Sequence, residues 1–365
     1  MKKLLKGFDY FFIGFSYLAS KKIIAILVVC LFVSLLKTSF AYQEELEVKE
    51  ERLNLIENDM IYEKTSTDIS YYNDEVDRID YGEGTAILDY IACYQEGINM
   101  DEVPQNISDQ INKLKGLFDE SQQYYSFYYQ DLFSGFTVSY NEDSPIFTAS
   151  TIKAPAMIYL YEKASAKEID LNESLVYDGR FYSEGSGVLK SKELGTSYTV
   201  GELIYYAIHY SDNIAYAMLM NHFSKTDILA FWNNLGTKHI FTQNTIWGIT
   251  SAKDASIYMK ELYRFSKKNE EYGTVLMDYF KGSDWKMVTD KDGNFYTASK
   301  GGWAGTAIHD AAIVFDENPY ILIVMSNTGE SNYSYLFKNA SEMVGDLHEE
   351  YWKYKVDTCK KIAQY

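Results

Sequence analysis

Three serine residues in the chain are each followed, three positions later, by a lysine. The pairs are Ser34 and Lys37, Ser150 and Lys153, and Ser283 and Lys286. Residues three apart on a helix share a face, so such a lysine could take the hydroxyl proton and turn the serine into a nucleophile. Because the spacing occurs three times, the pairs alone do not identify a site.

The pair Ser150 and Lys153 begins a stretch, residues 151–164, whose pattern predicts a helix. A serine at a helix N-terminus lies where backbone N–H groups and the helix dipole favour developing negative charge. The structural alternative is that Ser150 is an ordinary helix-capping residue. The choice between the two depends on what the rest of the chain brings near this serine.

Two further short motifs follow in the chain. Ser211-Asp212-Asn213 comes directly after a predicted helix, and Lys300-Gly301-Gly302 ends a strand predicted over residues 295–299. Taken individually, each has a structural alternative: Asn213 could be a helix-capping residue and Lys300 a surface lysine. The structural alternative is much weaker for the three motifs together, in this order, than for any one of them alone.

The order S-x-x-K, S-D-N and K-x-G resembles the active-site serine enzymes that recognise penicillin, most closely the class A β-lactamases. The resemblance covers residues 107–365. It implies that Ser150 is the nucleophile, that Lys153 is its base if burial and a second cation lower its pKa, and that Ser211 passes a proton to the leaving nitrogen.

The same resemblance assigns the substrate-binding residues. Asn213 would orient Lys153 and the substrate amide, and Lys300 would be the second cation and attract a substrate carboxylate. Gly301, Gly302 and Trp303 complete this set, with the backbone N–H groups of Ser150 and Trp303 as the oxyanion hole. No metal site is apparent in the sequence, and we expect no cofactor.

The chain departs from the family in two places. Class A β-lactamases carry a glutamate after S-D-N that activates the water for deacylation, whereas residues 228–253 contain no Asp or Glu. Gly301 also stands where the family has a threonine or serine whose hydroxyl helps to bind the β-lactam carboxylate. We therefore expect Ser150 to be acylated and the acyl-enzyme to turn over slowly.

The elements that must position these motifs are strands at both ends of a helical middle. Strands are predicted over residues 124–132, 135–140, 295–299, 306–315 and 320–326, and almost only helices and loops over residues 165–290. This pattern predicts an α/β (α+β) protein of the β-lactamase/transpeptidase type. Its antiparallel sheet, built from N- and C-terminal segments, would be flanked by helices and would carry an inserted all-helical lobe.

The N-terminal third predicts attachment to a membrane. We divide the chain into a basic cytoplasmic segment (1–22), a transmembrane anchor or signal sequence (23–41), an acidic extracytoplasmic stalk (42–105) and the hydrolase domain (106–365). The alternatives are a signal peptide cleaved after Ser39-Phe40-Ala41, giving a secreted protein, and a faint lipid-attachment pattern at Cys30. Cys93 and Cys359 fit no metal spacing; we treat them as unpaired thiols, with a disulfide as the alternative.

The net charge of -18 argues against nucleic acid as a partner, because phosphate backbones select basic surfaces. The expected ligands are a small-molecule β-lactam or a peptidoglycan stem peptide. Three functions remain open: a β-lactamase-related hydrolase, a D-alanyl-D-alanine carboxypeptidase or other penicillin-binding protein, and a non-enzymatic wall or antibiotic sensor.

Overall fold

The computed structural model describes residues 93, 103–119, 125–241, 245–327, 329 and 333–362. The segments 1–22 and 23–41 and most of the stalk lie outside the described residues. Among the described residues we find no helix with both the length and the hydrophobicity that a membrane span requires.

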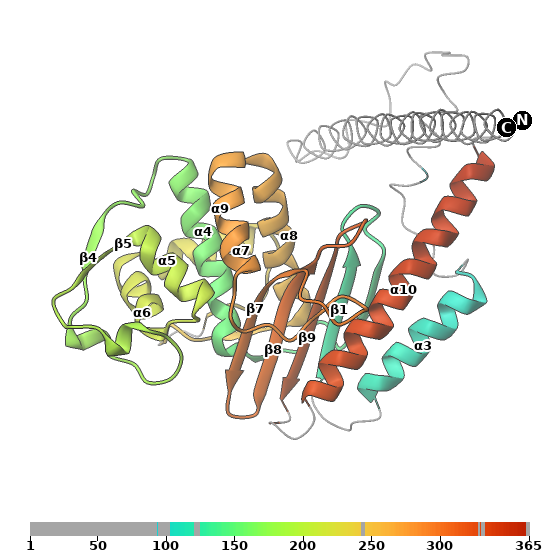
Figure 1. The fold of residues 1–365 in the computed structure, drawn as a ribbon, viewed down its shortest axis with the longest axis horizontal. Coiled ribbons are helices and arrows are strands. Elements are labelled where there is room, and N and C mark those ends of the chain that lie inside the picture. Colours follow the sequence, from blue (N-terminus) through green and yellow to red (C-terminus); the bar gives the residue numbers. More distant parts are fainter. Residues whose placement is uncertain are drawn as a thin grey trace, which may run out of the picture. The chain divides into compact units, whose positions relative to one another are not determined.

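Five antiparallel strands form the main sheet. They are β1 (Tyr125–Asp131), β2 (Thr137–Tyr140), β7 (Thr297–Ala304), β8 (Ala307–Val314) and β9 (Tyr320–Asn327). Their order across the sheet is β2-β1-β9-β8-β7, so the two strands before the helical region pair with the three that follow it (Figure 1). The prediction of a sheet assembled from both ends of the domain is confirmed.

Strand β9 shows why this sheet needs helices on both faces. Leu322 and Val324 belong to one hydrophobic cluster, whereas Ile321, Ile323 and Met325 belong to the other. A strand whose successive apolar side chains enter two different clusters is stable only if both faces of its sheet are covered. Helices α3 (Gln105–Asp119) and α10 (Tyr333–Ile362) cover one face, and α8 (Ala252–Lys268) packs against β1, β8 and β9 on the other (Figure 1).

The inserted lobe contains the remaining helices. They are α4 (Lys153–Ser165), α5 (Val200–His209), α6 (Asn213–His222), α7 (Lys225–Asn234) and α9 (Glu270–Lys281), with 3₁₀ turns at Ala149–Ile152 (η2), Gly179–Phe181 (η3) and Leu189–Ser191 (η4). The lobe is not all helical. Two short sheets pair β3 (Ile146–Phe147) with β6 (Ile249–Thr250), and β4 (Ser174–Val176) with β5 (Ser197–Thr199). Helix α9, which the sequence patterns did not predict, packs against α8 and β7.

Cys93 and Cys359 are joined by a disulfide across 266 positions of sequence. Our reading of the two as unpaired thiols is therefore wrong, and the alternative pairing holds. Nothing in the local sequence marks the pair, because the bond depends on how far α10 extends. Residue 359 lies in the last turns of that helix, and the disulfide joins it to a segment that precedes α3.

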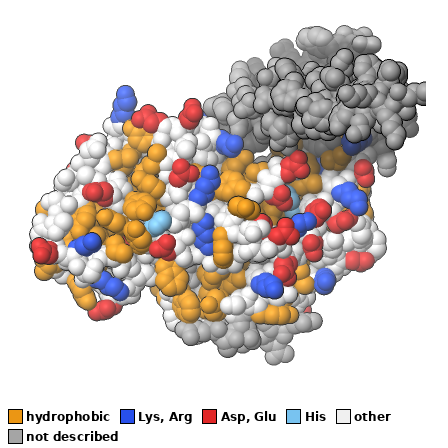
Figure 2. Space-filling view, viewed as in Figure 1, with side chains coloured by type: hydrophobic (Ala, Val, Ile, Leu, Met, Phe, Trp, Pro, Cys, Tyr) orange, Lys and Arg blue, Asp and Glu red, His pale blue; other side chains and the backbone are white. Residues whose placement is uncertain are grey.

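Acidic and basic side chains are interspersed on the face shown in Figure 2, without a continuous basic surface. Hydrophobic side chains gather between them in several places.

Candidate active site

Ser150 lies in the turn η2, between strand β3 and helix α4. The residue before it, Ala149, has a φ of 46°, a left-handed conformation that costs free energy for any residue except glycine. The segment is held in this shape because Thr148 accepts hydrogen bonds from the N–H (3.2 Å) and hydroxyl (2.6 Å) of Thr151, and donates its own N–H to Gly248 (3.0 Å). Ser150 is 8% exposed, so its hydroxyl is placed in a nearly closed site.

Lys153 begins α4 and is fully buried. Its Nζ lies 3.2 Å from Ser150 Oγ, 3.2 Å from Ser211 Oγ and 2.7 Å from Asn213 Oδ1, and it also contacts the Ser211 carbonyl oxygen. Burial lowers the pKa of Lys153 well below its usual value, and the nearby Lys300 lowers it further, while Asp212 opposes both. A lysine in this state is suited to accept the Ser150 proton.

Ser211 joins the two lysines. Its Oγ lies 3.2 Å from the Nζ of Lys153 and 3.0 Å from the Nζ of Lys300. Lys300 is fully buried and also donates to the Gly301 carbonyl oxygen (2.8 Å), and burial lowers its pKa to about 7 against the opposing effect of Asp310. One hydroxyl between two amines that lose protons readily is an arrangement for relaying a proton.

Asn213 begins α6, and its amide is fixed at both ends. Oδ1 accepts from Lys153, and Nδ2 donates to the Glu184 carbonyl oxygen at 2.8 Å. The preceding Asp212 caps the helix through the N–H groups of Ile214 and Ala215. Its other carboxylate oxygen accepts the N–H groups of Val188 (2.6 Å) and Leu189 (2.8 Å). Asp212 therefore ties the 184–189 loop to the site.

Strand β7 contains Lys300, Gly301, Gly302 and Trp303. It is paired with β8 along these residues, with Lys300 opposite Ala311. The expectation that the motif ends its strand is therefore wrong. A Cβ on Gly302 would lie 2.9 Å from the Ser150 backbone nitrogen and 2.8 Å from that of Thr151, so only glycine permits this approach. Trp303 is 37% exposed at the rim, with its ring 5.4 Å from that of Tyr333.

Gly301 lacks a side chain for a structural reason. A Cβ there would lie 2.5 Å from the Trp285 carbonyl oxygen. The loop before β7 therefore takes the place that a hydroxyl-bearing side chain would need.

Two aromatic rings lie near Lys153 that the motifs did not reveal. The centroids of Tyr216 and Trp247 are 5.9 Å and 5.7 Å from the Lys153 Nζ. Trp247 lies within residues 228–253, the stretch that contains no acidic residue. The absence of acids drew attention to this stretch, but only the fold shows which residue lies against the lysine.

The described pair with the same spacing, Ser283 and Lys286, does not form this arrangement. Lys286 Nζ donates to the Thr297 carbonyl oxygen (2.7 Å) and contacts the Lys281 carbonyl. The buried Ser283 Oγ has no hydrogen-bond partner among the described residues. Ser34 and Lys37 lie outside the described residues. The structure thus brings Ser150, Lys153, Ser211, Asn213 and Lys300 together.

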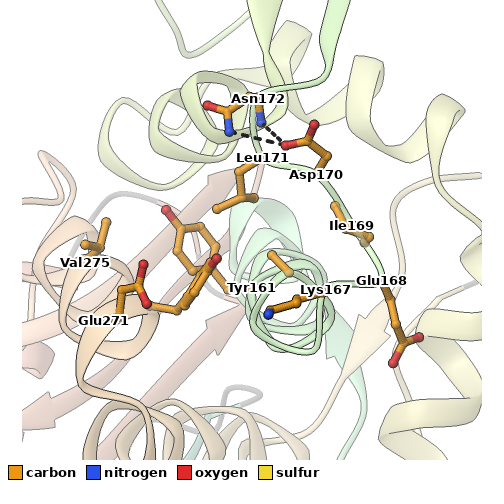
Figure 3. Close-up of a pocket in the computed structure, with 11 residues that line it drawn as sticks. Tyr161, Lys167, Glu168, Ile169, Asp170, Leu171, Asn172, Glu271 and Val275 are labelled. Carbon is orange, nitrogen blue, oxygen red and sulfur yellow. Dashed lines mark hydrogen bonds between the residues drawn. The ribbon is translucent and has the colours of Figure 1, made fainter.

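A pocket of about 640 Å³ lies at the opposite end of α4 (Figure 3). Tyr161 and Ala164 line it, about 12 Å and about 16 Å along the helix from Lys153 at 1.5 Å per residue. Its lining contains none of the predicted site residues. Within the described residues, no group of three or more His, Cys, Asp or Glu side chains could hold a metal.

Comparisons with known proteins identify the family and the fold of the chain. The model of the β-lactamase enzyme family matches residues 106–350. A structure of PBP-A is 19% identical, covers 67% of this chain and 97% of its own, and has a TM-score of 0.61; a PBP-A mutant solved as an acyl-enzyme complex with penicillin G gives the same values. A β-lactamase from Sphaerobacter thermophilus is 17% identical, with 67% and 96% covered and a TM-score of 0.58. No curated protein matches the chain.

Proposed function

The chain belongs to the β-lactamase enzyme family and is a serine hydrolase acting on amide bonds, and we propose that Ser150 attacks the carbonyl of a β-lactam or related cell-wall amide. The observation that carries this is the contact of 3.2 Å between Lys153 Nζ and Ser150 Oγ in a buried site. A serine needs an adjacent base to become a nucleophile, and a buried amine of lowered pKa is such a base.

The proposed acylation conserves its protons. Lys153 takes the Ser150 proton as Oγ bonds to the carbonyl carbon, and the N–H groups of Ser150 and Trp303 stabilise the oxyanion. The carbon–nitrogen bond then breaks, and the Ser211 hydroxyl donates its proton to the leaving nitrogen. Ser211 is reprotonated from Lys153 or Lys300, since its Oγ contacts both amines.

We propose that deacylation is slow. Residues 228–253 offer no carboxylate, and the rings of Tyr216 and Trp247 lie against Lys153 where a base would have to activate water. After a pulse of penicillin G and removal of the free drug, intact mass spectrometry should show an acyl-enzyme that persists for minutes or longer. Hydrolysis of a chromogenic cephalosporin at about 10 s⁻¹, a typical enzyme turnover, would contradict slow deacylation.

The second candidate is a D-alanyl-D-alanine carboxypeptidase or other penicillin-binding protein. The same lack of a carboxylate favours it, as does the likeness in fold to PBP-A. Product analysis on a peptide ending in D-Ala-D-Ala separates the two: release of D-alanine supports the carboxypeptidase, and an intact peptide favours a β-lactam substrate.

The third candidate is a wall or antibiotic sensor that binds without covalent chemistry. A wild-type protein that forms no adduct with either probe, but binds penicillin G in equilibrium measurements, would support this function over both enzymes. The contact between Lys153 and Ser150 is the observation against it.

We also propose that residues 23–41 anchor the protein in the membrane with the catalytic domain outside the cytoplasm. The bond between Cys93 and Cys359 supports this, because disulfides persist mainly in oxidising compartments. External protease should digest residues 106–365 on intact spheroplasts while the protein stays in the membrane fraction. Protection from protease would contradict the orientation, and release into the medium would favour signal cleavage.

A further inference from the structure

His309 is a buried histidine whose two ring nitrogens are both engaged. It lies on β8, its Nε2 is 2.7 Å from the Phe147 carbonyl oxygen, and its Nδ1 is 3.2 Å from the Ser326 backbone nitrogen. A carbonyl oxygen only accepts, so Nε2 carries the proton; the Ser326 N–H donates, so Nδ1 carries none. Burial lowers the pKa of His309 to about 4, which keeps this neutral form at working pH. His309 is thus a fixed donor to Phe147.

The carbonyl that His309 holds belongs to the segment of the nucleophile. Phe147 ends β3, which pairs with β6 rather than with the main sheet, and Ser150 follows three residues later. Between them lies Ala149 in its left-handed conformation. The bond from His309 therefore ties the strained lead-in to Ser150 to the rigid five-stranded sheet.

The residue paired with His309 on the neighbouring strand also contacts this segment. His309 is paired with Gly302 across β7 and β8. Gly302 approaches so closely that a Cβ there would lie 2.9 Å from the Ser150 nitrogen and 3.1 Å from the Thr148 carbonyl oxygen. The pair of His309 and Gly302 thus fixes the nucleophile segment twice: the His309 imidazole holds it from β8, and the backbone of Gly302 packs against it from β7.

We propose that His309 is a positioning residue for acylation. By holding the Phe147 carbonyl, it sets the Ser150 N–H and Oγ relative to the N–H of Trp303, the residue after Gly302. A displacement of about 1 Å in such a site can cost about 100-fold in rate. Loss of the donor should slow acylation while leaving the initial, non-covalent binding of substrate nearly unchanged. The kinetic part of this inference rests on the proposed function.

The test compares two substitutions of similar shape, His309→Gln and His309→Met. Glutamine can donate from its amide to Phe147, and methionine cannot. Stopped-flow acylation by a fluorescent penicillin gives the dissociation constant and the limiting acylation rate separately. We expect His309→Met to lower the limiting rate by about 10- to 100-fold with the dissociation constant changed less than about threefold. His309→Gln should recover most of the rate.

His348 supplies the matched control. It is also buried, on α10, with its Nδ1 2.9 Å from the hydroxyl oxygen of Tyr129 and outside the site. His348→Met should lower the melting temperature without lowering the limiting rate. Equal rate losses in His309→Met and His348→Met, or equal losses in His309→Met and His309→Gln, would overturn the proposal.

A second measurement does not depend on acylation. Amide hydrogen exchange over residues 147–152 should be faster in His309→Met than in the wild type and near wild type in His309→Gln. If no variant is acylated, the proposed function fails while this measurement still decides the role of His309. Unchanged exchange in His309→Met would overturn it.

Discussion

The Nζ of Lys153 lies 3.2 Å from the Oγ of Ser150, and both side chains are buried. Transfer of the Ser150 proton across this contact requires a lysine that is unprotonated for part of the time, which a surface lysine would not be at neutral pH. Burial and the proximity of Lys300 lower the pKa of Lys153 and so provide that state.

Removal of the Lys153 amine should slow acylation with little change in substrate binding. Lys153→Met keeps the length of the side chain and removes the base, a group typically worth about 10²- to 10⁴-fold in rate. The limiting acylation rate, measured by stopped flow, should fall within that range. Lys286→Met is the control, because Lys286 has the same motif spacing but donates to Thr297. A rate loss as large in the control would mean that the base has been misassigned.

Lys300 predicts a specific pH dependence of stability. Its pKa is about 7 in the folded protein and about 10.4 in an unfolded chain. Between these values the unfolded chain binds more protons, so the contribution of Lys300 to the free energy of unfolding rises with pH. Below pH 7 both states are protonated and the contribution is constant.

The free energy of unfolding of the wild type, relative to Lys300→Met, should therefore rise by about 2 kcal/mol between pH 7 and pH 9. Urea denaturation at pH 6, 7, 8 and 9 measures this difference. Parallel pH profiles for the two proteins would show that Lys300 does not titrate in this range.

Introduction of a carboxylate beside Lys153 should accelerate deacylation. The ring of Trp247 is 5.7 Å from the Lys153 Nζ, so Trp247→Glu would bring an acid near the acyl-serine. General base catalysis of water attack should shorten the lifetime of the penicillin acyl-enzyme by at least about tenfold. Trp247→Gln has the same length without the charge. If both variants deacylate equally fast, the acceleration comes from the space left by the Trp247 ring and not from the carboxylate.

A side chain on Gly302 should disturb the nucleophile segment. The Cβ of Gly302→Ala would lie 2.9 Å from the Ser150 nitrogen, so strand and turn must separate. Overpacking of this kind costs about 1–3 kcal/mol of stability, and acylation should slow as well. Gly116→Ala on α3 is the control, since no atom lies within 4 Å of its Cβ and a helix gains from alanine. Wild-type acylation by Gly302→Ala would show that the close contact has no role.

The three motifs predicted which residues the fold brings together around Ser150, but the elements around the motifs were harder to predict. The two glycines after Lys300 suggested the end of a strand, whereas β7 continues to Ala304 because β8 pairs along its whole length. Glycine in a strand usually indicates a turn or bulge, and here it permits close approach to Ser150 and to Trp285.

Helix α9 was missed for a related reason. It contains Gly273, which disfavours a helix by propensity. A Cβ at that position would lie 2.6 Å from the Phe265 carbonyl oxygen, so the tight packing of α9 on α8 requires the glycine. The contacts of His309 and Trp247 could not be predicted, because their partners are far away in sequence, and the disulfide between Cys93 and Cys359 was predicted only as an alternative. The bond from His309 to Phe147, for example, spans 162 positions.

The central claim is that Ser150 forms the covalent bond. The most direct test is exposure of the purified domain to penicillin G, followed by intact mass spectrometry and peptide mapping, with Ser150→Ala and Ser283→Ala alongside. We predict one penicilloyl adduct on the peptide containing Ser150 in the wild type and in Ser283→Ala, and none in Ser150→Ala. An adduct that persists in Ser150→Ala, or a wild type that forms none, would contradict the account.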